Sequence, residues 1–235
     1  MTLSEVMTEL QSYGMEGIKN ILIKHGAKEP LFGVKVEDLK KILKKTKTNT
    51  PLAKQLFATG NYDAMYLSGL MANGAEMTAA EIDGWAQKAY GSGISEYTVP
   101  WVASENPACL TLALKWIESK EESVAVNGWA ALCALVSIRP DEELDIPLLF
   151  ALLRRVKQEI HQAPNRVRYE MNAFMICAGA YVPALTDEVV TMAKEIGKVS
   201  VFMNGTACKV PLVADYIGKI TKMGKIGKKR KTAKC

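Results

Sequence analysis

Helical periodicity runs along almost the whole chain of 235 residues, and it limits the possible folds more than any other feature. Apolar residues recur three and four positions apart, as one buried face of an α-helix requires. No segment shows the sustained alternation of apolar and polar residues that is typical of a half-buried strand. The spacing predicts helices over residues 3–12, 15–25, 36–46, 50–58, 61–73, 78–90, 94–104, 107–118, 122–138, 145–160, 165–182, 186–196 and 207–221. We therefore expect an all-α fold.

The predicted helices are organised in pairs from residue 50 onward. The pairs repeat after about 35 to 40 residues, and short turns that contain Gly, Asn or Pro join them. This rhythm is typical of HEAT-like helical repeats, which stack into a solenoid, an α-α superhelix. We expect a single domain of this kind over residues 1–221. Because the repeats share little sequence, an ordinary helical bundle is the alternative.

Composition excludes several classes of protein. The chain is 49% hydrophobic and 23% charged, which is typical of a folded domain and not of a disordered one. The longest uncharged runs, residues 123–138 and 171–186, have 16 residues each, so they predict buried helices rather than membrane spans. No signal peptide is visible, and we expect a cytoplasmic protein without a membrane partner.

Cysteine and histidine give no sign of a metal or cofactor site. The five cysteines are an odd number without a Cys-x-x-Cys pair, so neither a disulfide framework nor a zinc site is indicated. His25 and His161 lie far apart in the sequence and have no neighbours at metal-ligand spacing. We expect no metal and no cofactor, and the sequence carries no signal for an oligomeric state.

Positive charge is concentrated in blocks. Residues 35–54 hold seven bases against two acids, residues 154–168 five against one, and residues 63–145 four against thirteen. The last fourteen residues, 222–235, hold seven bases, and without them the formal net charge of +5 becomes −2. This tail lacks apolar periodicity, so we expect it to be mobile. Phosphate contacts require such local blocks rather than a high total charge, although lysine-rich faces are often merely solvated.

The first basic block is a lysine-striped helix that follows an apolar turn, Leu31-Phe32-Gly33-Val34. One face of this helix is apolar and can meet a core; it carries Val36, Leu39, Ile42 and Leu43. The opposite face is basic and carries Lys40, Lys41, Lys44 and Lys45. Such a face is suited to hold a polyanion.

The turn and the basic helix together resemble the N-terminal signature of the helical DNA alkylation repair family, the AlkC/AlkD group. In that signature an aromatic residue, a glycine and a valine precede the basic helix, and Phe32 stands here for the aromatic residue. Residues 166–172, 193–199 and 205–211 are similar to later HEAT-like repeats of the same family. The resemblance covers most of residues 1–221.

The resemblance implies a DNA glycosylase fold, with one important departure. Active members release positively charged alkylated purines, and they use an aspartate flanked by tryptophans and an arginine in a groove that cradles the duplex. The family pattern is Trp-x-x-x-Asp, and the best alignment places Gly93 at the tryptophan and Tyr97 at the aspartate. A neutral phenol cannot offset an oxocarbenium-like centre. The arginine position falls near Ala131 or Leu132 and the later tryptophan near Ile176, so the chain resembles a divergent member without the usual catalytic residues.

Candidate functional residues follow from these patterns. Glu96 is a weak substitute for the aspartate because it lies one residue out of register, about 100° away on a helix. Its expected pocket neighbours are Tyr97, Trp101 and Trp129. The candidates for phosphate contacts are the basic residues Lys35, Lys40, Lys41, Lys44, Lys45, Arg154, Arg155, Arg166 and Arg168, which we expect to line a concave face.

Three hypotheses about function remain open. The first is a protein that binds double-stranded, damaged or branched DNA by backbone and shape, with little or no glycosylase activity. The second is an active, metal-independent N-glycosylase that excises 7-methylguanine or 3-methyladenine and uses Glu96 with Trp101 or Trp129. The third is a HEAT-like protein-interaction scaffold, whose partner surface is the acidic segment 63–145.

Overall fold

The structure, a computed structural model, describes residues 1–235 and contains helices but no strand. The α-helices are α1 (Leu3–Ser12), α2 (Glu16–Lys24), α3 (Val36–Thr46), α4 (Thr50–Ala58), α5 (Tyr62–Met71), α6 (Ala79–Lys88), α7 (Val99–Ser104), α8 (Cys109–Trp116), α9 (Glu122–Ile138), α10 (Ile146–Glu159), α11 (Asn165–Tyr181), α12 (Thr186–Ile196) and α13 (Val213–Lys222). Short 3-10 turns span Gly74–Glu76, Asp141–Glu143 and Pro183–Leu185, and a π-helix, η2, spans Gly93–Thr98. The all-α fold predicted from the sequence is confirmed.

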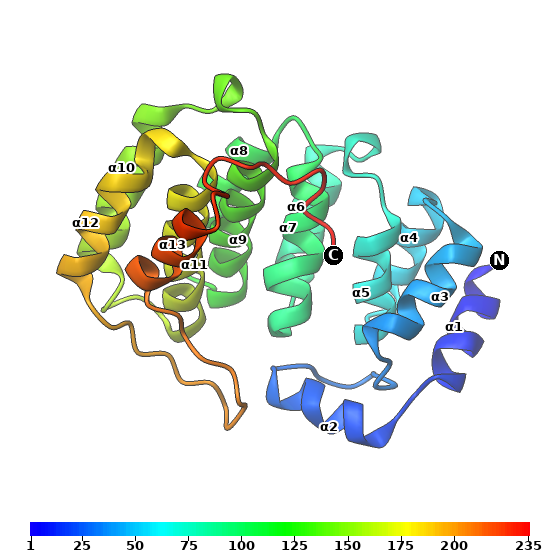
Figure 1. Ribbon diagram of the computed structural model, residues 1–235. Helices are drawn as coiled ribbons and strands as arrows, with labels where there is room; N and C mark the ends of the chain where they lie inside the picture. Colours follow the sequence, from blue (N-terminus) through cyan, green and yellow to red (C-terminus); the bar gives the residue numbers. More distant parts are fainter.

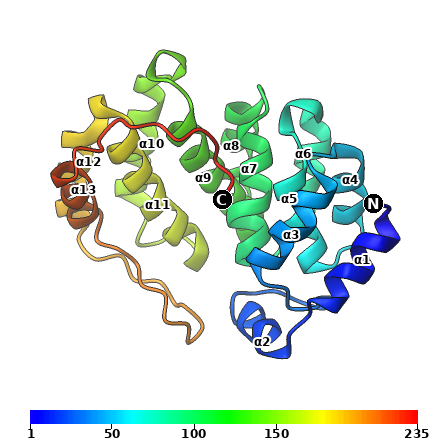
Figure 2. The same cartoon turned by 45° about the vertical axis from the view of Figure 1, so that its right-hand side comes forward.

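Neighbouring helix pairs lie side by side and form a curved array (Figures 1 and 2). The pairs α4 and α5, α8 and α9, and α10 and α11 are in contact, and α7, α9 and α11 follow one another along the array. The helices α5, η2, α9 and α11 line a central cleft, whereas α4, α6, α8 and α10 supply none of its lining residues. The array therefore has an inner layer that faces the cleft and an outer layer behind it.

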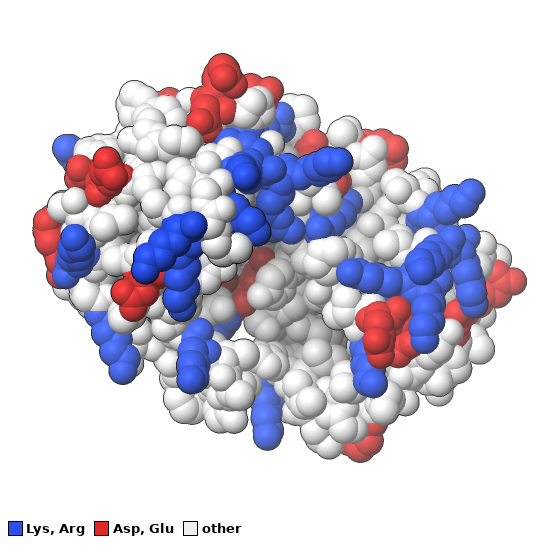
Figure 3. Space-filling view, in the orientation of Figure 1, with Lys and Arg blue, Asp and Glu red and all other residues white.

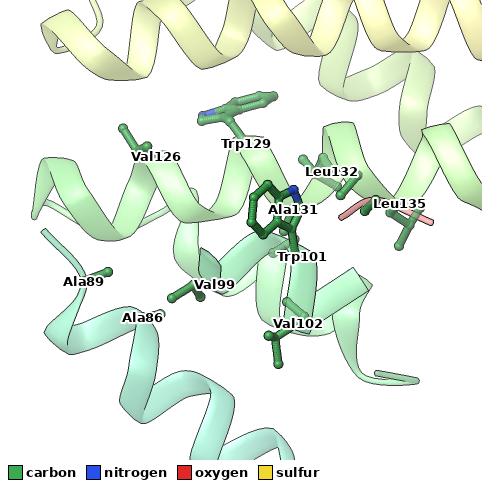
Figure 4. Close-up of a cluster of buried hydrophobic side chains, with 14 of the residues drawn as sticks. Ala86, Ala89, Val99, Trp101, Val102, Val126, Trp129, Ala131, Leu132 and Leu135 are labelled. Carbon is green, nitrogen blue, oxygen red and sulfur yellow. The ribbon is translucent and has the colours of Figure 1, made fainter. Parts of the chain in front are cut away.

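The apolar runs identified in the sequence form the central inner helices. α9 is buried almost all round, from Val124 to Ser137, and α11 packs along it. Figure 4 shows buried side chains of α9 in one cluster with those of α7 and of the end of α6. No single helix is both long and apolar enough to cross a membrane, and α11 with the following segment up to Ile196 passes that test only as a pair bent by 116°.

The apolar turn before α3 is held by one buried carboxylate. Asp63, at the start of α5, accepts hydrogen bonds from the backbone N–H groups of Phe32, Gly33 and Val34 at 2.6, 3.1 and 2.8 Å. Gly33 has a φ of +81°, and a Cβ there would lie 2.5 Å from the backbone nitrogen of Lys19. The signature turn thus needs its glycine for steric reasons, and its contacts join the N-terminal helices to the repeats.

Two predicted helices differ from the structure. The segment 94–104 begins as the π-helix η2, in which the N–H of Val99 donates to the carbonyl of Ile94, and continues as α7. Pro100 lacks the N–H that a regular α-helix needs at this point, which favours the wider turn. The last helix begins at Val213 rather than at residue 207, because Pro211 disfavours a helical residue before it. Residues 197–212 form a long irregular loop instead.

The C-terminal tail, expected to be mobile, lies against the body. The N–H of Gly227 donates to Ala180 O and the N–H of Arg230 to Ser137 O, each at 2.8 Å, and Ala233 is buried. These contacts join residues that are far apart in the sequence. Apolar periodicity is a local property, so it could not predict them. The tail reaches from α13 across the array to α5 and α7 (Figure 1).

Candidate nucleic-acid interface

The central cleft holds two adjoining cavities of about 200 and 230 Å³. Both are lined by Glu96 of η2 and Arg166 of α11, so this pair stands between them. The first cavity is mostly polar, and Glu122 of α9 and residues of the 197–212 loop complete it. The second is mostly apolar and aromatic. Figure 3 shows the cleft as a hollow in the face of the molecule.

Glu96 lines the cleft but is almost wholly buried. Its side chain is only 3% exposed, and it forms an ion pair with Arg166, whose Nε donates to Oε1 at 2.7 Å. Burial raises the pKa of Glu96, and the guanidinium opposes that rise. Arg166 is fixed from several sides, because its backbone N–H donates to Glu122 and its guanidinium lies 4.3 Å from the ring centre of Tyr169. The π-helix and the ion pair with Arg166 together fix the orientation of the Glu96 side chain.

A second buried carboxylate lies beside this pair. Glu170 follows Arg166 by one helical turn on α11, and it has no cation within ion-pair distance. Burial raises the pKa of Glu170 well above its ordinary range, and the charge of Glu96 adds to the effect. The guanidinium of Arg166 is thus the one positive charge close to both Glu96 and Glu170. It is paired with Glu96, which favours the protonated form of Glu170.

Tyrosines form the wall of the second cavity. They are Tyr62 and Tyr66 of α5, Tyr97 of η2 and Tyr169 of α11. Tyr97 is 43% exposed, and its ring centre lies 5.6 Å from that of Trp101. Burial of the rest of the ring, with the charge of Glu96, raises the pKa of Tyr97, so the residue at the aspartate position of the family pattern stays neutral. The wall offers aromatic faces but no negative charge of its own.

Gly93, at the tryptophan position of the family pattern, has no room for a side chain. A Cβ there would lie 2.3 Å from the hydroxyl oxygen of Tyr62, and that hydroxyl accepts the N–H of Gly93 at 2.8 Å. The Tyr62 hydroxyl thus fills the space that a larger residue at position 93 would need.

The two tryptophans predicted as neighbours of Glu96 differ in their positions. Trp101 is buried, and it lines a further cavity of about 210 Å³ together with Glu96 and Tyr97. Trp129 is 1% exposed and packs against Phe174 of α11, with ring centres 5.5 Å apart. It lines neither cavity of the cleft, so the prediction for Trp129 is wrong. Figure 4 shows the two rings pointing in different directions. Helical spacing alone does not determine which face of α9 meets the cleft, so the sequence could not show that Trp129 faces away from it.

The predicted basic residues of α3 lie beside the cleft. Val36 and Leu39 line the second cavity, and the lysines of α3 gather on the surface to one side of the hollow (Figure 3). Lys41 pairs with Asp38 at 2.7 Å and Lys45 with Glu9 at 2.6 Å, and Lys35 lies 3.7 Å from Glu37. Lys40 and Lys44 have no acidic partner.

The other predicted basic residues do not share one surface with α3. Arg154 and Arg155 belong to the outer helix α10, where Arg154 lies over the ring of Phe150 and Arg155 pairs with Glu118 and Glu159. Arg166 lies at the cleft, and Arg168 supports its edge by donating to Ser200 O at 3.1 Å. The expectation of a single concave basic face is therefore wrong for the α10 block.

Some residues of the site were missed by sequence reasoning. Tyr62 and Glu170 read as ordinary core positions, and the only available sign for Glu170 was an acid within an apolar helix. Phe202, which is 72% exposed, lines the first cavity from the 197–212 loop, where a helix had been predicted for part of the segment. No three residues among His, Cys, Asp and Glu lie together as a metal site would require.

A comparison with known proteins identifies relatives of this chain. A family model described as DNA alkylation repair enzyme matches residues 6–198. Two bacterial relatives are the uncharacterized protein Lin0241 of Listeria innocua and the uncharacterized protein Lmo0209 of Listeria monocytogenes. Each is 33% identical over 225 residues, which is 93% of this chain and 97% of the relative.

A solved structure matches the whole chain. It represents "a new family of proteins related to the HEAT-like repeat DNA glycosylases with affinity for branched DNA structures". The TM-score is 0.91 and the sequence identity is 36%, with 100% of both chains covered. The match confirms the HEAT-like repeat architecture that the period of the helix pairs predicted.

Proposed function

Because the chain belongs to the DNA alkylation repair enzyme family, we propose that it binds double-stranded DNA, with preference for branched forms, and has little or no base-excision activity. The observation that carries this proposal is a cleft with a basic rim whose buried acid, Glu96, is already paired with Arg166. The solved relative has affinity for branched DNA structures, which favours the same ligand class here.

Phosphate binding is supported by the free cations of α3. Lys40 and Lys44 have no acidic partner, so they can release counterions when phosphates approach. Contacts of this kind do not read base sequence. A curved surface with such a rim recognises the shape of the duplex, and this supports a preference for DNA structure over sequence.

The geometry disfavours base excision. Developing positive charge on a sugar needs a nearby anion with free lone pairs. The Glu96 side chain is almost wholly buried and its charge is offset by Arg166, and Tyr97 at the cleft surface is neutral. Neither the Glu96 carboxylate nor the Tyr97 phenol therefore provides the free anion that base excision needs.

An active glycosylase is the second candidate, because Glu96 does line both cavities and has a raised pKa. DNA that carries 7-methylguanine or 3-methyladenine should be incubated with the protein, and the released base measured by chromatography. We expect no release above the protein-free control. Release that disappears in Glu96→Gln would overturn the proposal in favour of the enzyme.

The binding proposal is tested by direct comparison of DNA structures. Dissociation constants should be measured by fluorescence anisotropy for a four-way junction, a three-way junction and a linear duplex of the same base composition, each at several salt concentrations. We expect salt-dependent binding to all three and tighter binding to the junctions. Absence of binding to any DNA at low salt would instead favour the protein-interaction scaffold.

A further inference from the structure

The C-terminal tail follows the ends of the inner helices. It meets the last turn of α11 at Ala180 and the last turn of α9 at Ser137, through backbone hydrogen bonds of 2.8 Å. Lys229 Nζ donates to Val136 O at 2.9 Å, and Lys234 Nζ donates to Ala72 O, directly after α5. The tail therefore crosses three inner helices at the same end, from one side of the cleft to the other.

Two lysines of the tail lie at helix C-termini. The last carbonyl groups of each helix have no partner within the helix, and the helix dipole places partial negative charge there. Lysine Nζ and backbone N–H groups of the tail satisfy these carbonyls. A poly-basic segment without apolar periodicity can thus be ordered by a row of helix ends.

Only two of the seven tail cations are neutralised by acids of the body. Lys229 Nζ lies 2.8 Å from Asp141 Oδ1, and Lys234 Nζ lies 2.9 Å from Glu105 Oε1. Both of these side chains are largely buried. The remaining cations are exposed and have no acidic partner; they are Lys222, Lys225, Lys228, Arg230 and Lys231. The tail is consequently a ridge of uncompensated positive charge.

Figure 3 shows two separate groups of basic side chains around the central hollow, one over α3 and one over the tail. Because the two groups lie on different sides of the hollow, a single straight DNA arm that follows one of them leaves the other free. A branched DNA presents two arms at an angle, each with its own phosphate backbone.

We propose that the C-terminal tail is a second phosphate-binding surface, which holds the backbone of the second arm of a branched DNA while the α3 side holds the first. This inference rests on the proposed DNA-binding function and deepens it, since it assigns the preference for branched forms to a defined segment. The exposed lysines Lys225, Lys228 and Lys231 provide the contacts, and Lys229 and Lys234 fix the tail in place.

The test removes charge from the tail without removing its anchors. The triple variant Lys225→Gln, Lys228→Gln, Lys231→Gln leaves the two ion pairs and the backbone hydrogen bonds intact. The matched control has the same net charge and changes three exposed lysines without acidic partners elsewhere: Lys88→Gln, Lys120→Gln and Lys194→Gln. Thermal unfolding of both variants should match that of the unmodified protein.

We expect the tail variant to bind a four-way junction at least about tenfold more weakly at low salt, with a salt slope smaller by about 2 to 3, as loss of three phosphate contacts requires. Its affinity for linear duplex should stay within about twofold of the control, on the same counterion argument. Unchanged junction affinity would overturn the inference, and so would an equal loss for junction and duplex. Failure of the unmodified protein to bind any DNA would instead defeat the proposed function itself.

Discussion

Glu96 and Arg166 are 70 residues apart in sequence and form an ion pair between the two cavities of the central cleft, with Nε 2.7 Å from Oε1. The pair joins the π-helix η2 to the start of α11, across the middle of the array. It also offsets the charge of Glu96, the carboxylate next to the position where the family pattern has its aspartate. One contact thus both stabilises the cleft and leaves Glu96 without a free negative charge.

Arg166→Gln should destabilise the protein by about 3 to 5 kcal/mol at pH 8, because it leaves a carboxylate buried without its counter-charge. Burial already raises the pKa of Glu96 in the folded state, and loss of the guanidinium raises it further. Protonation at low pH removes the unpaired charge, so the loss should shrink as pH falls toward 5. Urea unfolding at both pH values measures this; a loss that is the same at both would contradict the role of the charge.

Glu170→Gln should make stability less dependent on pH. The pKa of Glu170 is raised well above its ordinary range by burial, so the folded state binds a proton that the unfolded state has released. Stability therefore declines as pH rises above the ordinary glutamate range toward the folded pKa, and glutamine removes that decline. Thermal unfolding between pH 5 and pH 9 checks this prediction. Parallel profiles for the two proteins would show that Glu170 is ionised throughout.

Asp63→Asn should cost about 2 kcal/mol or more, since Oδ2 accepts from Phe32 and Gly33 and Oδ1 accepts from Val34. An amide nitrogen in either place would face a donor. Asp215→Asn, at an exposed position of α13, is the matched control and should change stability by less than about 0.5 kcal/mol. Chemical unfolding measures both, and equal effects would show that the three hydrogen bonds contribute nothing specific.

Gly93→Ala should lower the free energy of unfolding of the protein by about 1 to 3 kcal/mol, because the new Cβ would clash with the Tyr62 hydroxyl. Tyr62→Phe removes that oxygen, so Gly93→Ala should cost less in the Tyr62→Phe background. A double-mutant cycle of unfolding free energies provides the measurement. Additive effects would mean that the hydroxyl does not restrict position 93.

Lys40→Gln with Lys44→Gln should weaken binding to linear duplex and reduce the salt slope by about 2, one unit for each phosphate contact. The control on the same helix is Lys41→Gln with Lys45→Gln, which removes cations already paired with Asp38 and Glu9. We expect the control to lose less affinity. Anisotropy titrations at four salt concentrations distinguish the two variants, and equal slopes would place the contact surface away from the free lysines.

The sequence alone predicted most of the helices and the repeat architecture. Helical periodicity is a local property, since the residues that share a face of α3 or α9 are only three or four positions apart. The departure of Gly93 and Tyr97 from the family pattern was equally visible. Errors arose where a proline altered the backbone, at Pro100 and Pro211, because the consequence depends on which hydrogen bonds the surroundings can replace.

The tertiary structure decided everything that depends on contacts between distant segments. Examples are the ion pair of Glu96 with Arg166, the burial of Trp129 in the core, and the contacts of the basic tail with the ends of α9 and α11. No spacing rule encodes these contacts, because burial and helix dipoles act through space between residues of different repeats. The sequence by itself therefore determined the fold class, and only the fold determined which charges remain unpaired at the surface.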